Sequence, residues 1–323
     1  MPIESAETQA MSYRYLRIAM VGLLLALAAA VLYQSTRQHS VLASVSAYYY
    51  TPAQAVFVGA LIGLGACMIA LQGMNDAEDT FLNLGGILAI VVALVPTGRG
   101  PDFKSAVQAC QKRGGTLLTA PRGPKLDCPT VQALENATRA NVENNIAALL
   151  IVGGLALILA GGILIKGRTA RGGILRRGWV LAAFSVAVLL WLGGLAALLA
   201  SVAWLADNGH YIAAGGLLLC ILLVAGVNAH RERSDVRGVP KGDVPKSSRA
   251  FLYTWVAVAM LVVAGVFIVL WLTNVISLFV VEIVVAGLFA VFWIVQTWEL
   301  EARPDAQGAE IPGSTATAQT AGQ

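Results

Sequence analysis

Eight apolar runs, each about as long as a membrane-spanning helix, dominate this sequence and restrict the folds open to it. At a rise of about 1.5 Å per residue, about 20 apolar residues cross a bilayer core about 30 Å thick. Inside hydrocarbon every backbone amide must be paired, so each run predicts a helix. The expected fold is all-α, a polytopic transmembrane helical bundle of about eight spans. The runs cover 15–34, 53–72, 81–98, 146–166, 178–206, 211–229, 250–272 and 275–297.

The distribution of basic residues predicts the orientation of this bundle. If both termini are cytoplasmic, 14 of the 22 Lys and Arg residues fall on the inner side and 8 on the outer side. Positive residues concentrate in cytoplasmic loops, so the pattern predicts N-in and C-in. The 16 Arg and 6 Lys indicate a GC-rich bacterial genome. The predicted location is therefore the bacterial inner (plasma) membrane, as a multi-pass protein.

Composition also limits the partners. A net charge of +4 is explained by basic loops facing anionic inner-leaflet lipid, so membrane lipids are expected partners and nucleic acid is not. A protein partner stays open. Only 12% of the residues are charged, as a bilayer protein requires.

The chain divides into a short cytoplasmic tail, a bundle and a second tail. Residues 1–14 form the first tail, 15–297 the transmembrane bundle and 298–323 a polar tail without periodicity, which we expect to be disordered. The first run has features of a signal peptide, but its polar leader favours an uncleaved anchor. The glycine pairs Gly59/Gly63, Gly153/Gly154 and Gly161/Gly162 predict close helix contacts within the bundle.

The outer loop 99–144 contains two cysteines and two helix-forming stretches. Cys110 and Cys128 would face an oxidising exterior, so we predict a disulfide between them. One helix is expected up to Cys110, and another after Pro129 that continues into the fourth span. Together they predict a small disulfide-bonded helical cap on the outer face. Cys67 and Cys220 lie in mid-span and are interpreted as packing residues.

Several polar residues near the outer ends of the spans predict a binding site. Glu282 lies about 10 Å deep in the last span, where a carboxylate costs about 2.5 kcal/mol or more unless it is protonated, paired or facing a cavity. We therefore expect it to face polar groups inside the bundle. The three tyrosines of SVSAYYYTP are interpreted mainly as an aromatic belt. The candidate binding residues are Ser44, Ser46, Tyr49, His210 and Glu282.

A second polar group is expected on the inner side, near the loop between the second and third spans. Its acidic residues are either solvated in a short turn, or one of Glu78 and Asp79 reaches a basic inner loop and joins two halves of the bundle. The members of this inner polar cluster are Asp76, Glu78, Asp79, Asn83, Asn228, Gln296 and Glu299.

Several motifs together resemble a known family. They are SxSxYYYTP at 44–52, FVG at 57–59, ED at 78–79, NLGG at 83–86 and ALVPT at 93–97 in the first half. In the second half they are HY at 210–211, NA at 228–229, Glu282 and FWxxQTxE at 292–299. The chain is similar to an uncharacterised family of bacterial, mainly actinobacterial, multi-pass membrane proteins. The resemblance implies a plasma-membrane bundle and no particular activity.

Motifs of soluble enzymes are absent from the sequence. It contains no P-loop, no C-x-x-C and no H-E-x-x-H. A remoter likeness to lipid hydrolases related to alkaline ceramidases fails, because the three histidines, His39, His210 and His230, form no H-x-x-x-H pair. We therefore expect no metal, no cofactor and no assigned catalytic residue.

The expected function is binding of a lipid or partner at the outer polar site, without catalysis. Two alternatives stay open. One is a transporter or proton-coupled carrier that uses Glu282, as the one ionisable residue deep in a span. The other is a lipid-modifying hydrolase of the outer leaflet, which requires Ser44 or Ser46 within hydrogen-bond reach of His210.

Overall fold

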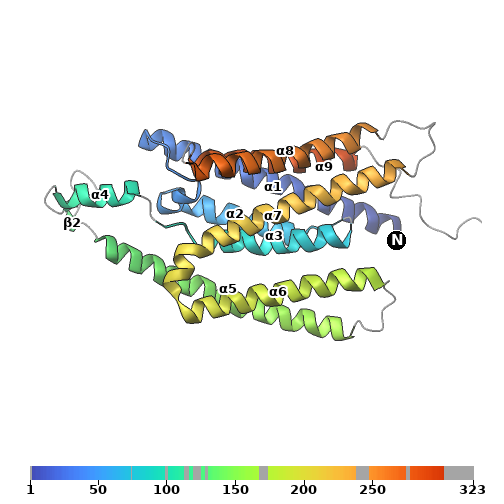
Figure 1. The fold of residues 1–323 in the computed structure, drawn as a ribbon, viewed down its shortest axis with the longest axis horizontal. Helices are drawn as coiled ribbons and strands as arrows, with labels where there is room; N and C mark the ends of the chain where they lie inside the picture. Colours follow the sequence, from blue (N-terminus) through green and yellow to red (C-terminus); the bar gives the residue numbers. More distant parts are fainter. Residues whose placement is uncertain are drawn as a thin grey trace, which may run out of the picture.

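The computed structural model is a bundle of long helices that run side by side along one axis (Figure 1). It describes residues 2–73, 75–98, 101–112, 116–118, 125–127, 130–166, 174–237, 247–273 and 277–301. The elements are α1 (Pro2–Gln38), the 3-10 helix η1 (Ser46–Tyr50), α2 (Gln54–Ala70), α3 (Asp76–Leu94), α4 (Pro101–Lys112), β1 (Thr116–Leu118), β2 (Lys125–Asp127), α5 (Val131–Lys166), α6 (Ile174–Ala200), α7 (Val202–Arg237), α8 (Ser247–Leu272) and α9 (Leu278–Glu301).

The predicted helical bundle is confirmed, and each of the eight apolar runs falls largely on one helix. Six helices of the described chain are long and apolar enough to cross a membrane. These candidate spans lie within α1, α3, α5, α6, α7 and α9, one in each. The other two apolar helices are shorter, at 17 residues for α2 and Thr254–Val263 within α8. The number of spans and their orientation stay predictions.

The turn between α6 and α7 lies earlier than the sequence predicted. The fifth run was expected to extend to residue 206, with a loop before His210. Instead the chain turns at Ser201, whose Oγ accepts a hydrogen bond of 3.2 Å from the Trp204 amide at the start of α7. Asn208 does not break the helix, because its side chain bonds the Trp204 carbonyl at 2.9 Å. His210 therefore lies inside α7, more than two turns from its start.

The cap differs from the predicted pair of helices. It contains α4 and a β1–β2 hairpin, in which Thr116 pairs with Asp127 and Leu118 with Lys125. The second expected helix is the first part of α5, which continues into the apolar run without a break, as predicted. Figure 1 shows α4 at one end of the bundle and the N-terminus at the other. We call these the cap end and the opposite end.

Cys110 is disulfide-bonded, but its partner is not among the described residues. Cys128 lies outside the described residues, and the free thiols of the described chain belong to Cys67 and Cys220. The pairing of Cys110 with Cys128 stays a prediction. The proposed disordered tail lies, from residue 302, outside the described residues, while residues 2–14 form the first turns of α1.

The main buried core gathers side chains from α1, η1, α2, α3, α7, α8 and α9. Helices α5 and α6 lie at the side of this core (Figure 1). They are held together partly by Trp191 of α6, whose indole nitrogen donates a 2.7 Å hydrogen bond to the Leu150 carbonyl of α5. Their apolar windows have no buried residues. Such an extended apolar surface is incompatible with water and suits contact with hydrocarbon.

Glycine contacts occur, but only partly where the sequence placed them. A Cβ on Gly59 would meet nothing within 4 Å, so this residue makes no close helix contact. Gly153 and Gly154 do lie against the Trp191 ring. The tightest approach joins α2 and α3. A Cβ on Gly65 would lie 2.5 Å from the Gly86 carbonyl oxygen, and one on Gly86 would lie 2.6 Å from that of Gly65.

A pair of substitutions in α2 tests this contact. Gly65→Ala should lower the free energy of unfolding by about 1–3 kcal/mol, because α2 and α3 must move apart. Gly59→Ala, in the same helix with open space around it, should leave the stability unchanged or slightly higher. The midpoint of thermal unfolding of the detergent-solubilised protein measures both. Equal midpoints for the two variants would contradict the close approach.

Candidate functional site

The start of α9 is bound to the segment that precedes η1, at the cap end. The Phe279 amide donates a 2.8 Å hydrogen bond to the Ala43 carbonyl. One turn further, Glu282 Oε2 accepts from the Val45 amide at 2.5 Å, and its Oε1 lies 3.0 Å from Ser46 Oγ. The carboxylate is thus turned toward polar groups of the bundle, as the cost of burying it in an apolar span predicted.

His210 completes this arrangement from α7. Its Nε2 lies 2.8 Å from Ser46 Oγ, and its Nδ1 lies 2.7 Å from the Val95 carbonyl at the end of α3. Both Ser46 and His210 are buried, at 3% and 2% exposure. We call Val45, Ser46, Val95, His210 and Glu282 the outer clamp. It joins η1, α3, α7 and α9 at one point.

The hydrogen bonds of the outer clamp determine how many protons it holds. A carbonyl only accepts, so His210 Nδ1 must carry a hydrogen. The two contacts of Ser46 Oγ then need two hydrogens, and the hydroxyl supplies one. The other comes either from an imidazolium at His210 or from a carboxylic acid at Glu282. In both forms the clamp holds one proton more than a neutral imidazole and an ionised carboxylate would, so it carries no net charge, which suits a low-dielectric site.

The other predicted residues of the site lie close by with different roles. Ser44 Oγ accepts a 3.0 Å hydrogen bond from the Ala47 amide, so it shapes the start of η1. Tyr48 and Tyr49 are buried, which makes the aromatic-belt interpretation wrong for both. The Tyr48 hydroxyl bonds the Ser35 hydroxyl and the Leu42 amide. Tyr49 packs edge-on against Tyr50 and Phe57.

A cavity of about 280 Å³ opens beside the outer clamp. Ser46, His210 and Glu282 are not among its lining residues, so the space lies next to the predicted group rather than within it. Tyr49 is the one predicted binding residue that also lines the cavity. The lining consists of Tyr49, Tyr50, Thr51, Gln54, Pro96, Thr138 and Asn141.

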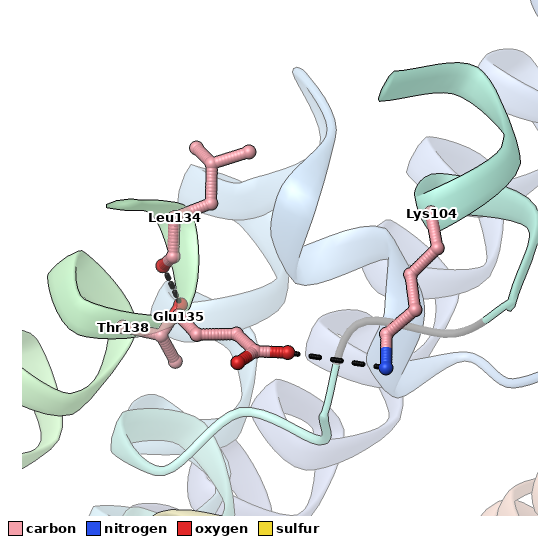
Figure 2. A network of polar contacts seen from close by, with 4 residues as sticks. All are labelled: Lys104, Leu134, Glu135 and Thr138. Carbon is pink, nitrogen blue, oxygen red and sulfur yellow. Dashed lines mark hydrogen bonds and ion pairs between the residues drawn. The ribbon is translucent and has the colours of Figure 1, made fainter. Parts of the chain in front are cut away.

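The cap contributes to the surroundings of this cavity. Figure 2 shows Lys104 of α4 reaching toward Glu135 of α5, with 3.9 Å between Lys104 Nζ and Glu135 Oε1. One turn along α5, the Thr138 hydroxyl donates a 3.0 Å hydrogen bond to the Leu134 carbonyl (Figure 2). Thr138 and Asn141 were not predicted as site residues, because only the fold brings α5 beside η1.

At the opposite end the structure brings together part of the inner polar cluster. Glu78 is 1% exposed, so the solvated interpretation is wrong for this residue. Asn228 Nδ2 donates to Glu78 Oε1 at 2.9 Å and to the Val224 carbonyl at 3.1 Å. These contacts join α3 to α7. Glu78 therefore stabilises the packing of α3 against α7 through the Asn228 amide.

The remaining members of that cluster either form hydrogen bonds with residues close in sequence or have side chains outside the described part of the chain. Asp79 accepts from the Gly73 amide at 3.2 Å and from Asn83 Nδ2 at 3.3 Å. The Asp76 carbonyl accepts a hydrogen bond from the Thr80 hydroxyl. The side chains of Gln296 and Glu299 lie outside the described part of the chain.

Two features of the interior were not predicted from the sequence: the burial of Arg17, and the presence of buried ionisable side chains besides Glu282. Arg17 of α1 is 4% exposed, with its guanidinium 5.7 Å from the centre of the Trp293 ring, a cation–π arrangement. It had been counted only as a basic residue of the inner side. His210 and Glu78 are also buried, so Glu282 is not alone as an ionisable group in the helices. Within the described ranges, no three metal-ligating side chains gather in one place.

Two substitutions at Glu282 test the outer clamp. In Glu282→Gln the amide oxygen can accept from Val45 and the amide nitrogen can donate to Ser46, whose hydroxyl then bonds His210. In Glu282→Leu these groups lose their partner, at about 1–3 kcal/mol for each buried group left unpaired. We expect a near-normal unfolding midpoint for the glutamine variant and a clearly lower one for the leucine variant. Equal losses would contradict the clamp.

Comparisons with protein-family models, with curated proteins and with solved structures found no match. The resemblance to actinobacterial multi-pass membrane proteins therefore stays a prediction from the motifs at 44–52 and 292–299.

Proposed function

We propose that this chain is an integral protein of the bacterial plasma membrane that binds a lipid or a partner, without catalysis, at the cavity beside η1. The observation that carries the proposal is the position of that cavity. Its wall is the tyrosine segment, and the outer clamp fixes this segment by hydrogen bonds to α9 and α7. A binding site held on rigid elements loses little conformational entropy when it is occupied.

The apolar helices and the positions of charge support the membrane orientation. The cap and η1 lie at one end, and the basic segments around 166–177 and 231–249 belong to the other if the apolar helices all cross the bilayer. Basic loops face the cytoplasm. In this orientation the cavity opens on the outer side, and both termini are cytoplasmic.

The clamp residues serve the site as its frame. Ser46, His210 and Glu282 satisfy one another and the backbone of Val45 and Val95, which leaves them little capacity to bind anything else. The side chains offered to a ligand are those of the cavity, of which Tyr49 alone was predicted. The proposed binding site thus shares Tyr49 with the predicted set and includes none of its other members.

Two glutamines at the two ends of α2 provide the test. Gln54 lines the cavity and Gln72 lies just beyond the other end of the helix, and both are exposed. The Gln54→Cys variant should react with a membrane-impermeant maleimide on intact cells. The Gln72→Cys variant should react only after permeabilisation. Adding the host's extracted membrane lipids to delipidated Gln54→Cys protein should slow its labelling several-fold.

The unsubstituted chain, whose Cys220 is buried and Cys67 partly buried, controls for background labelling. Labelling of the two variants with the reverse pattern would contradict the orientation. Labelling of Gln54→Cys at an unchanged rate in the presence of lipid and of cell extract would contradict the binding function.

A hydrolase is the second candidate, because one distance favours it. The 2.8 Å between Ser46 Oγ and His210 Nε2 lies within the range that a serine nucleophile and its base require. Three facts weigh against it: the serine is buried, its oxygen also contacts Glu282, and His210 Nδ1 is oriented by a carbonyl instead of a carboxylate.

The proton-coupled carrier also stays an alternative, tested by uptake into proteoliposomes with and without a pH gradient.

A serine-reactive fluorophosphonate separates binding from hydrolysis. If Ser46 only frames the site, the probe should leave the purified protein unlabelled, because the hydroxyl is 3% exposed and already bonded. Mass spectrometry of the digested protein locates any adduct, with Ser46→Ala as the control. An adduct on Ser46 that is lost in this variant would favour the hydrolase.

A further inference from the structure

We propose that the cavity beside η1 binds a neutral polyhydroxyl group, of the kind that a sugar-bearing lipid presents at the membrane surface. This inference rests on the proposed binding function and adds the chemical class of the ligand. It depends on three features of the lining: unused hydrogen-bonding groups, the absence of formal charge, and a pair of fixed tyrosine rings.

The lining offers neutral donors and acceptors that nothing in the described chain occupies. The side-chain amides of Gln54 and Asn141 form no hydrogen bond with described residues, and neither does the Tyr49 hydroxyl. An amide both donates and accepts, and so does a phenol. Adjacent hydroxyls of a sugar or polyol, each a donor and an acceptor, match such a set.

None of the seven lining residues carries a formal charge at neutral pH. The nearby ions Lys104 and Glu135 lie 3.9 Å from each other and so compensate one another. Helix α2 begins at the cavity, and helix N-termini favour anions. Here, however, the amides of Ala53 and Gln54 already bond the hydroxyl and the carbonyl of Thr51. Among the residues that line the cavity, a phosphate would find no positive side chain to pair with.

The tyrosines give the cavity a rigid aromatic wall. The rings of Tyr49 and Tyr50 meet edge-on, with 5.3 Å between their centres, and Tyr49 meets Phe57 in the same manner at 6.3 Å. The Tyr50 hydroxyl donates a 2.6 Å hydrogen bond to the Thr97 carbonyl, which fixes the second ring. A fixed ring presents an apolar face beside a polar edge, which matches the C–H face and the hydroxyl rim of a sugar ring.

The level of the cavity along the membrane normal favours a lipid headgroup over an acyl chain as the ligand. Asn141 precedes the apolar run that begins at Ile146 by five residues, or about 7 Å along the helix. Gln54 stands at the start of the apolar run of α2. Both amides are thus placed at the level of lipid headgroups. A volume of about 280 Å³ lies near the lower end of ligand pockets and suits one small headgroup.

The experiment compares two lipids with identical acyl chains, a monoglycosyl diacylglycerol and a phosphatidylglycerol, added to the delipidated full-length protein. Native mass spectrometry measures how much of each is retained. We expect the glycosyl lipid to be retained preferentially. Asn141→Ala should weaken its binding about tenfold, because about two hydrogen bonds are lost. Asn208→Ala, at a partly buried asparagine outside the cavity, is the matched control and should retain it fully.

Free methyl glycoside distinguishes the source of the ligand. If it slows labelling of the Gln54→Cys variant as well as the glycosyl lipid does, the site takes a soluble sugar. If only the lipid slows labelling, the site takes a glycolipid, and both outcomes support the polyhydroxyl class. Equal or better retention of phosphatidylglycerol would overturn the inference while preserving the proposed function. Equal retention by Asn141→Ala and Asn208→Ala would overturn it too.

Discussion

The contact between Glu282 and η1 holds the cap end of the bundle together. One carboxylate group reaches the Val45 amide and the Ser46 hydroxyl across 237 and 236 residues of sequence. A carboxylate in an apolar helix is costly unless polar groups surround it, so its partners constrain the chain strongly. His210 then connects the same serine to the end of α3. Four elements are thereby fixed in position relative to one another at the cap end.

The rest of the bundle obeys the same constraint. Between apolar helices in hydrocarbon, burial of apolar surface gives little driving force, and polar contacts with close packing take its place. At the opposite end the Asn228 amide bonds the buried Glu78, which joins α7 to α3. Midway, Gly65 and Gly86 let α2 and α3 approach to backbone contact. Helix α3 takes part in all three arrangements, and this explains why it lies at the centre of the main core.

The sequence was sufficient for whatever depends on local pattern. Apolar runs located the eight helices, and the cost of burying Glu282 predicted that it would face polar groups. What it missed depends on tertiary contacts. Asn208 looked like part of a loop, but its side chain bonds its own helix, and α7 already begins at Val202. Tyr48 and Tyr49 looked interfacial because no local pattern shows that α1 and α2 enclose them. Asn141 became a site residue only when α5 packed beside η1.

The outer clamp also bears on the kind of function that this fold supports. A catalytic serine needs a free side on which the substrate can approach, and its base must be free to take the proton. Ser46 instead lies between an acid and an imidazole, with one hydroxyl hydrogen for two contacts, and none of the three side chains lines the cavity. The shared proton leaves the outer clamp without net charge, and its three side chains bond one another instead of a ligand. Its effect is transmitted through the backbone of η1, which places Tyr49 and Tyr50 in the cavity wall. A rigid wall of neutral groups is suited to selecting a ligand by shape and hydrogen bonding.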